Sequence, residues 1–382
     1  MSPAATSPPV ACTVCGARYE HERLVVSCIC GGLLELAPPA PLTSEHVDTL
    51  ETGPWRYAAA LPRVPAAGRV RLGEARTPLV PVRIDGADAL LKAEYALPTG
   101  SYKDRGSAVV VSLLHHVGVT EVMDDSSGNA GASLAAYAAA AGMRCVVYVP
   151  ASNSSGKLAQ IRGYGAELRP IGGDRAAAMR DAAAADGAPF YASHNRMPAF
   201  IAGVSTLGFE LWEDLGHAAP AVVVVPAGHG SLVLALAHAF RALRSGGSID
   251  RLPRLIAVQA QTRSALSAAW SSGRDEVTAL DHGPTIAEGV AAVRPLYGGQ
   301  LLRAIRESHG DVLTVTEHEI AAALRDLGRL GHYVEPTSAV AVAGFRRLAG
   351  SNTATNDTVV VLTGSGLKSA WPDAEMGEMF SG

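Results

Sequence analysis

The amino-acid sequence predicts an α/β fold built on a parallel sheet that helices cover on both faces. From about residue 78 onward, short β-branched runs alternate with longer, Ala- and Leu-rich segments of helical character. The strand candidates are almost continuously apolar, which is typical of strands buried on both faces of a parallel sheet. Hydrophobic residues make up 48% of the 382 residues and charged residues 18%, so the chain can bury a sizeable core.

The expected elements follow one another regularly along this part of the chain. The strand candidates are 89–92, 121–125, 144–149, 221–225, 255–258 and 358–362. The helix candidates are 107–116, 131–141, 175–185, 232–243, 317–327 and 338–348. In such sheets ligands bind beyond the carboxyl ends of the strands, so the strand-to-helix loops are the predicted place for chemistry.

Charge and targeting patterns exclude several classes of function. The 32 basic and 36 acidic side chains give a net charge of −4, which argues against a nucleic-acid partner and a polybasic membrane-surface role. The sequence contains no uninterrupted run of about 18 apolar residues, so we expect no transmembrane helix. Residues 1–9 lack the basic and apolar regions of a secretory signal. We therefore expect a cytoplasmic protein with no nucleic-acid or membrane partner.

Four of the five cysteines form two close pairs near the N-terminus. The pairs are Cys12-x2-Cys15 and Cys28-x-Cys30. Four thiolates at this spacing favour a structural zinc ion in a ribbon at 10–37, with no open position for catalysis. Free thiols or disulfides are the alternative, although nothing suggests the export that disulfides require. The Pro-rich run at 38–41 predicts a boundary with a main body at 38–382.

The first strand-to-helix loop, residues 98–106, reads Pro-Thr-Gly-Ser-Tyr-Lys-Asp-Arg-Gly. It places Lys103 in the first turn of a predicted helix. The positive end of the helix dipole lowers the cost of a neutral amine there, as a Schiff-base lysine requires. Taken alone, a lysine at a helix start is more often a solvated surface charge.

Two further loops are rich in glycine and hydroxyl groups. The loop at 126–131, Ser-Ser-Gly-Asn-Ala-Gly, opens a helix and suits a carboxylate, although these are also ordinary turn residues. The loop at 226–231, Pro-Ala-Gly-His-Gly-Ser, indicates a phosphate cradle without P-loop or Rossmann glycine spacing. One such loop would be weak evidence, whereas three together favour an active site.

These loops resemble the motifs of threonine synthases, which belong to the fold-type II pyridoxal-phosphate enzymes. The resemblance covers nearly the whole chain. Besides the three loops and the cysteine segment it includes Trp55-Arg56-Tyr57, Thr77-Pro78-Leu79, Lys157-x2-Gln160, and the motifs at 335–339 and 362–368. It implies a two-lobed, parallel-sheet fold-type II body with a smaller lobe at about 102–205. A small zinc-ribbon-like segment would precede that body.

The resemblance also implies roles for individual residues. Lys103 would bind pyridoxal phosphate covalently and, once displaced by the substrate amine, act as the base at the α-carbon. The cofactor-binding residues would be Lys103, Asn129, Ala227, Gly228, His229, Gly230, Ser231 and Thr363. The substrate-binding residues would be Thr99, Ser126, Ser127, Asn129, Lys157 and Arg162. Such enzymes are often homodimers, and we expect the same here.

The implied activity is that of a carbon–oxygen lyase in amino-acid biosynthesis. It would convert O-phosphohomoserine to threonine and phosphate by γ-elimination and β-hydration. The sequence departs from the family where a Lys-Thr pair commonly follows Gly203, since Val204-Ser205-Thr206 stands there. A specialised paralogue that performs β-elimination or β-replacement on a serine-, threonine- or phosphoserine-like amino acid is therefore the alternative. A non-catalytic binding protein is a third hypothesis, which the intact lysine, asparagine and threonine disfavour.

Overall fold

The computed structural model describes residues 10–369 except 22–23, 151–155, 173–178, 180–181, 184, 352–354 and 356. The chain divides into two units, each assembled from two separate stretches. Unit 1 comprises Met1–Arg76 and Leu97–Thr206, and unit 2 comprises Thr77–Ala96 and Leu207–Gly382. The last of the three boundaries along the chain falls within helix α5 (Pro198–Asp214).

Unit 1 contains an antiparallel ribbon and a parallel sheet. The ribbon, in the order β2-β1-β3, consists of β1 (Val10–Cys12), β2 (Arg18–Tyr19) and β3 (Leu34–Leu36). The sheet, in the order β8-β7-β6-β9, consists of β6 (Glu121–Asp124), β7 (Arg144–Pro150), β8 (Glu167–Ile171) and β9 (Phe190–Tyr191). Its helices are α1 (Lys103–His116), α2 (Asn129–Ala140) and α3 (Gly156–Gly163), together with the start of α5.

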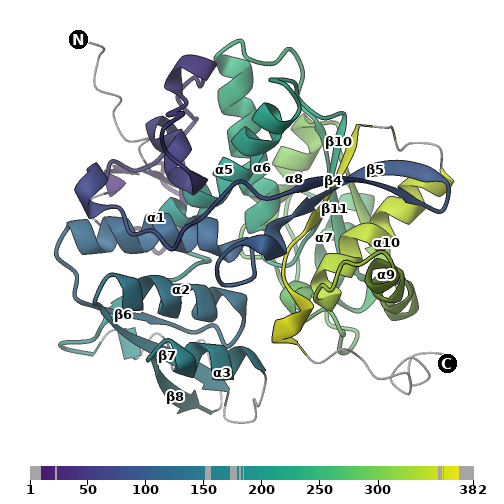
Figure 1. The fold of residues 1–382 in the computed structure, drawn as a ribbon. Helices are drawn as coiled ribbons and strands as arrows, with labels where there is room; N and C mark the ends of the chain where they lie inside the picture. Colours follow the sequence, from purple (N-terminus) through teal and green to yellow (C-terminus); the bar gives the residue numbers. More distant parts are fainter. Residues whose placement is uncertain are drawn as a thin grey trace. The chain divides into compact units, whose positions relative to one another are not determined.

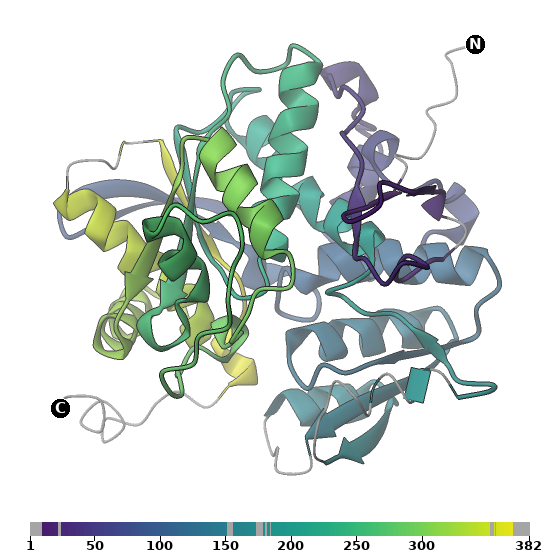
Figure 2. The same cartoon turned by 180° about the vertical axis from the view of Figure 1, so that it is seen from behind.

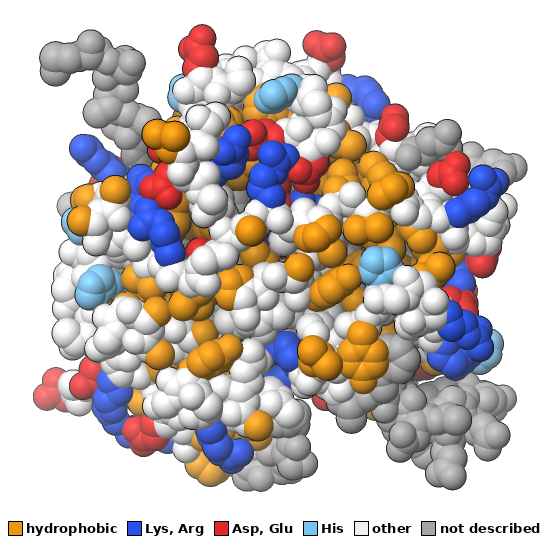
Figure 3. Space-filling model, in the orientation of Figure 1, with side chains coloured by type: hydrophobic (Ala, Val, Ile, Leu, Met, Phe, Trp, Pro, Cys, Tyr) orange, Lys and Arg blue, Asp and Glu red, His pale blue; other side chains and the backbone are white. Residues whose placement is uncertain are grey.

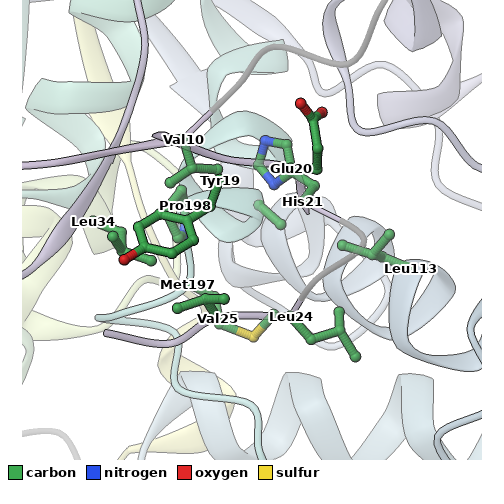
Figure 4. A pocket seen from close by; sticks show the side chains of 11 residues that line it. Val10, Tyr19, Glu20, His21, Leu24, Val25, Leu34, Leu113, Met197 and Pro198 are labelled. Carbon is green, nitrogen blue, oxygen red and sulfur yellow. The ribbon is translucent and has the colours of Figure 1, made fainter. Parts of the chain in front are cut away.

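Small side chains explain the close packing of unit 1. Helix α2 is rich in alanine and almost wholly buried, so it fits between α1 on one side and β6 and β7 on the other (Figure 2). The ribbon packs on the same unit, where Val10 and Leu34 lie with Leu113 of α1 and Met197 around a small cavity (Figure 4). The ribbon is therefore joined to the unit that carries Lys103.

Unit 2 contains a six-stranded sheet in the order β12-β11-β10-β13-β5-β4. The strands are β4 (Leu79–Ile84), β5 (Ala87–Ala93), β10 (Val222–Pro226), β11 (Arg254–Ala260), β12 (Asp311–Val315) and β13 (Thr358–Leu362). The helices are α6 (Ser231–Ser245), α7 (Ala265–Ser271), α8 (Gly298–Glu307), α9 (Glu317–Arg329) and α10 (Pro336–Gly350).

Both faces of the unit 2 sheet are buried, as the apolar strands predict. Val222 and Val224 of β10 join a core cluster with α9 and α10. Val223 and Val225 point to the opposite face because side chains alternate along a strand, and they are fully buried as well. Helices α6 and α8 pack on β11, while α10 packs on β10 and β13 (Figure 1).

One edge of this sheet departs from the predicted all-parallel arrangement. Strand β4 pairs antiparallel with β5, whereas the other neighbours in the sheet are parallel. The two strands are joined by Asp85 and Gly86, which have φ of 49° and 85°. Asp-Gly with positive φ at both positions is the signal of a tight hairpin turn. The α/β fold class is confirmed, with one mixed and one parallel sheet.

The surface agrees with the small net charge. Acidic and basic side chains are interspersed on the face shown in Figure 3, and the coloured side chains form no basic stripe there. None of the helices in the described part of the chain has the length and apolar character that crossing a bilayer needs. The expected helix at 175–185 lies largely outside the described residues.

Candidate active site

The predicted site residues fall into two groups, and each group is assembled within its own unit. Unit 1 contains Thr99, Lys103, Ser126, Ser127, Asn129, Lys157 and Arg162. Unit 2 contains Ala227, Gly228, His229, Gly230, Ser231 and Thr363. As predicted, the residues lie mostly in loops that lead from strands into helices.

Lys103 is the first residue of α1, with Tyr102 as its N-cap. The lysine side chain is partly buried. Its Nζ donates a hydrogen bond to Tyr102 Oη at 2.7 Å and lies 5.5 Å from the centroid of the Phe200 ring. The amine is thus held at a helix N-terminus beside a neutral hydroxyl, an arrangement suited to a reactive lysine.

A buried carboxylate fixes the loop that carries this lysine. Asp104 is fully buried and accepts hydrogen bonds from the Thr99 backbone N–H at 2.7 Å and from the Thr99 hydroxyl at 2.5 Å. The Ser133 hydroxyl of α2 donates to the same carboxylate at 2.7 Å. Asp104 therefore ties the turn before Lys103 to both α1 and α2. Neither Asp104 nor Ser133 was among the predicted site residues.

The loop at 126–131 leads directly into α2, whose N-cap is Gly128 without a side-chain cap. Ser126 and Ser127 are partly exposed, as is Asn129, the first residue of α2. Gly131 is held so tightly that an added Cβ would lie 1.9 Å from the Ser126 carbonyl oxygen. Hydroxyl groups beside a helix N-terminus are an arrangement suited to an anion.

Helix α3 places the two predicted phosphate contacts in different environments. Lys157 is only 6% exposed, whereas Arg162 in the last turn is exposed. Between them, the Gln160 side-chain amide donates to the Thr99 carbonyl at 3.0 Å. This bond joins α3 to the lysine loop.

In unit 2, the loop after β10 forms a narrow cradle at the start of α6. Gly230, the N-cap, has φ of 90° and no side chain to cap the helix. A Cβ at Gly228 would lie 2.5 Å from the Gly289 carbonyl oxygen, so only glycine fits there. Ala227 and Ser231 are buried, whereas His229 is exposed. The backbone N–H groups at the start of α6 suit a phosphate.

Thr363 follows β13 and is almost fully buried. Its hydroxyl lies 3.2 Å from Ser338 Oγ and 3.5 Å from Glu335 Oε1. Ser338 Oγ also accepts a hydrogen bond from the Gly364 backbone N–H at 3.1 Å. These contacts between the N-terminal part of α10 and the end of β13 fix the threonine hydroxyl. Ser338 was not among the predicted site residues, because only the fold brings it to Thr363.

The four ribbon cysteines converge as the spacing predicts. Cys12, Cys15, Cys28 and Cys30 place their sulfur atoms within 4.8 Å of one another. Four thiolates around one zinc ion have sulfur–sulfur separations of about 3.8 Å, so this cluster fits tetrahedral zinc. The Tyr19 hydroxyl, 3.0 Å from Cys28 Sγ, and a backbone N–H lower the pKa of the Cys28 thiol to about 6. A lowered pKa favours the thiolate form of Cys28. In the same cluster, hydrogen bonds with the other three thiols outweigh the Gly32 backbone N–H and raise the pKa of Cys30 to about 12.

Comparisons with known proteins agree with this geometry. Residues 70–364 match the family described as pyridoxal-phosphate dependent enzymes. The threonine synthase of Methanocaldococcus jannaschii is 33% identical over 379 residues, covering 95% of this chain and 93% of the relative. A solved threonine deaminase from T.th. is 28% identical with a TM-score of 0.63, covering 76% of this chain and 92% of that chain. Threonine deaminase isoform 2 from Solanum lycopersicum shares the fold, with a TM-score of 0.70 at 18% identity over 90% of this chain and 97% of that chain.

Proposed function

We propose that this chain is a threonine synthase. The chain belongs to the pyridoxal-phosphate-dependent enzymes and is a lyase of that family. The reaction would convert O-phosphohomoserine and water to threonine and phosphate. The observation that carries the proposal is the similarity to threonine synthases along almost the whole chain. The lysine loop at the start of α1 supports it, because it supplies the amine that this chemistry needs.

Each unit offers groups that would suit pyridoxal phosphate. Lys103 offers the amine for covalent attachment, and Asn129 opens the helix beside it as a partner for the ring oxygen. The cradle at 227–231 offers backbone N–H groups to the phosphate. The Thr363 hydroxyl suits the ring nitrogen without enforcing its protonation, unlike a carboxylate. When bound, the cofactor supplies an electron sink for the α-carbon of the substrate.

The chain's own groups would bind the substrate and move its protons. The loop at 126–131 would hold the substrate carboxylate, and Lys103 Nζ would take the α-proton. A β C–H bond and the γ C–O bond then break, and phosphate leaves with the electron pair of the C–O bond. Water adds its hydroxyl to the β-carbon, while protons return to the α- and γ-carbons. The proposed contacts of the substrate phosphate are Thr99, Lys157 and Arg162.

A second candidate reaction is β-elimination from a serine- or threonine-like amino acid. Ser205 favours this β-elimination. It is fully buried, and its hydroxyl donates to the Ala202 carbonyl at 2.6 Å within α5. This residue offers no cation to a substrate phosphate, whereas the family commonly has a Lys-Thr pair after Gly203. The similarity to a threonine deaminase points to the same chemistry.

Steady-state assays separate the two reactions. The protein with pyridoxal phosphate is expected to release phosphate from O-phosphohomoserine at least about tenfold faster than it releases ammonia from threonine or serine. Faster ammonia release, with no phosphate release above that of heat-denatured protein, would favour the alternative.

Gly131→Ala is expected to lower kcat/KM for the proposed reaction by about 100-fold. The new Cβ would lie 1.9 Å from the Ser126 carbonyl oxygen, so the carboxylate loop must shift. Gly163→Ala is the matched control, because an added Cβ there meets nothing within 4 Å. Wild-type kinetics in a correctly folded Gly131→Ala variant would contradict the role of this loop.

We propose that the ribbon cysteines bind one zinc ion with a structural role. The purified protein is expected to contain one zinc per chain, and Cys15→Ser to lose the metal and melt at a lower temperature, since metal binding stabilises the folded ribbon. Cys145→Ala is the control for zinc content, because Cys145 lies outside the cluster. Unchanged zinc content in Cys15→Ser would exclude this ligand set.

We propose a homodimer that works in the cytoplasm on a phosphorylated amino acid, with the ribbon at 10–37 and the catalytic body at 38–382. Size-exclusion chromatography with light scattering tests the oligomeric state directly.

A further inference from the structure

A tyrosine hydroxyl lies next to the Lys103 amine, and the steps above leave it without a role. Tyr102 Oη is 2.7 Å from Lys103 Nζ. The amine is 4.5 Å from the centroid of the same ring, so it approaches the hydroxyl rather than the ring face. Among the described residues of unit 1, no carboxylate forms an ion pair with this amine.

The surroundings hold this arrangement in place. Tyr102 is only 9% exposed, and its carbonyl accepts a hydrogen bond from the Arg105 backbone N–H at 3.2 Å. Phe200, on another side of the amine, is 2% exposed and packs on Gly106, where an added Cβ would lie 2.5 Å from the ring. The position of the amine is therefore set by one hydroxyl and one fixed aromatic ring.

A hydroxyl suits an amine that changes its protonation state. Tyrosine can donate a hydrogen bond to a neutral amine and, after rotation of its O–H, accept one from an ammonium. A carboxylate in this place would favour only the ammonium, through its charge. Tyr102 can thus hold the amine both before and after proton transfer.

We propose that Tyr102 is a positioning residue that orients the Lys103 amine for removal of the substrate α-proton. The inference rests on the proposed function of Lys103. In the step, the α C–H bond breaks and an N–H bond forms at Lys103 Nζ, while Tyr102 keeps its own proton. Its oxygen then accepts a hydrogen bond from the new ammonium.

The test compares Tyr102→Phe with the matched variant Tyr148→Phe in the holoenzyme. Tyr148 loses a hydroxyl that accepts from Arg169 at 3.3 Å, away from the lysine loop. Tyr102→Phe is expected to lower kcat about tenfold, with KM and the visible absorbance of the bound cofactor unchanged. Exchange of the α-proton of an amino-acid ligand with D2O, followed by NMR, slows by a similar factor. Tyr148→Phe changes none of these quantities.

Two outcomes would overturn the proposal. The first is wild-type kcat and exchange rate in Tyr102→Phe. The second is loss of cofactor absorbance and of thermal stability in that variant, since this shows a structural role. If the wild-type protein exchanges α-protons but does not release phosphate from O-phosphohomoserine, the threonine synthase proposal fails while the exchange comparison still tests Tyr102.

Discussion

Replacing Lys103 with alanine is expected to abolish threonine formation, with kcat lowered by about 1,000-fold or more. By the proposed function, the variant would lose both the amine that attaches the cofactor and the base that removes the α-proton. After dialysis the wild-type protein should show the absorbance band of covalently bound cofactor, and the variant should lack it. Thermal melting checks that the fold persists, since this side chain is only partly buried.

Lys103→Arg is the matched variant for charge. It keeps a cation at the start of α1 but cannot form the covalent bond, so we expect it to be as inactive as Lys103→Ala. More than about a tenth of wild-type activity in either variant would contradict the role of Lys103.

Replacing Lys92 with methionine is expected to destabilise the protein by about 3–5 kcal/mol. Lys92 is fully buried in unit 2, where its amine donates to Glu210 Oε1 at 2.6 Å and to Asp214 Oδ2 at 2.7 Å. The same amine donates to the Thr77 carbonyl at 2.8 Å. Methionine has a similar volume but leaves the buried Glu210 carboxylate without its cation. The urea midpoint of unfolding measures the change.

Arg144→Met is the control for this experiment. Arg144 forms ion pairs with Glu121 and Glu167, but all three side chains are nearly half exposed. Its removal should shift the midpoint far less, because water already solvates these charges. Equal shifts for the two variants would show that the buried amine is not a major source of stability.

Strongly apolar strands and the loops after them could be predicted from the sequence. The strand at 358–362 coincides with β13, and Lys103, Asn129 and Ser231 each stand at the first position of a helix. These features depend on local patterns: continuous Val and Leu runs, followed by glycine and hydroxyl residues.

Helix α5 could not be predicted, because its sequence contains glycines that normally break helices. The structure gives the reason for Gly208: an added Cβ would lie 2.6 Å from the Ala239 Cβ of α6. This glycine permits close packing of two helices, a requirement set by tertiary structure. The Asp85-Gly86 turn is different, since its hairpin signal was present in the sequence and would have predicted the antiparallel edge.

The supporting groups of the site were also beyond prediction. Asp104 forms a hydrogen bond with Ser133, which is 29 residues away in the sequence. Thr363 forms one with Ser338, which is 25 residues away. Such pairs depend on how α1 packs against α2 and how α10 meets the end of β13. Motifs identify groups that could act on a ligand, whereas the fold determines which side chains hold those groups in place.

The proposed reaction is tested most directly by turnover of O-phosphohomoserine in water enriched in oxygen-18. Elimination breaks the γ C–O bond and water adds at the β-carbon, so threonine and phosphate should form in equal amounts. The threonine hydroxyl should carry the solvent oxygen, and the phosphate should carry none. Solvent oxygen in the phosphate together with homoserine as the product, or no turnover of this substrate alongside rapid ammonia release from threonine, would contradict the assignment as a threonine synthase.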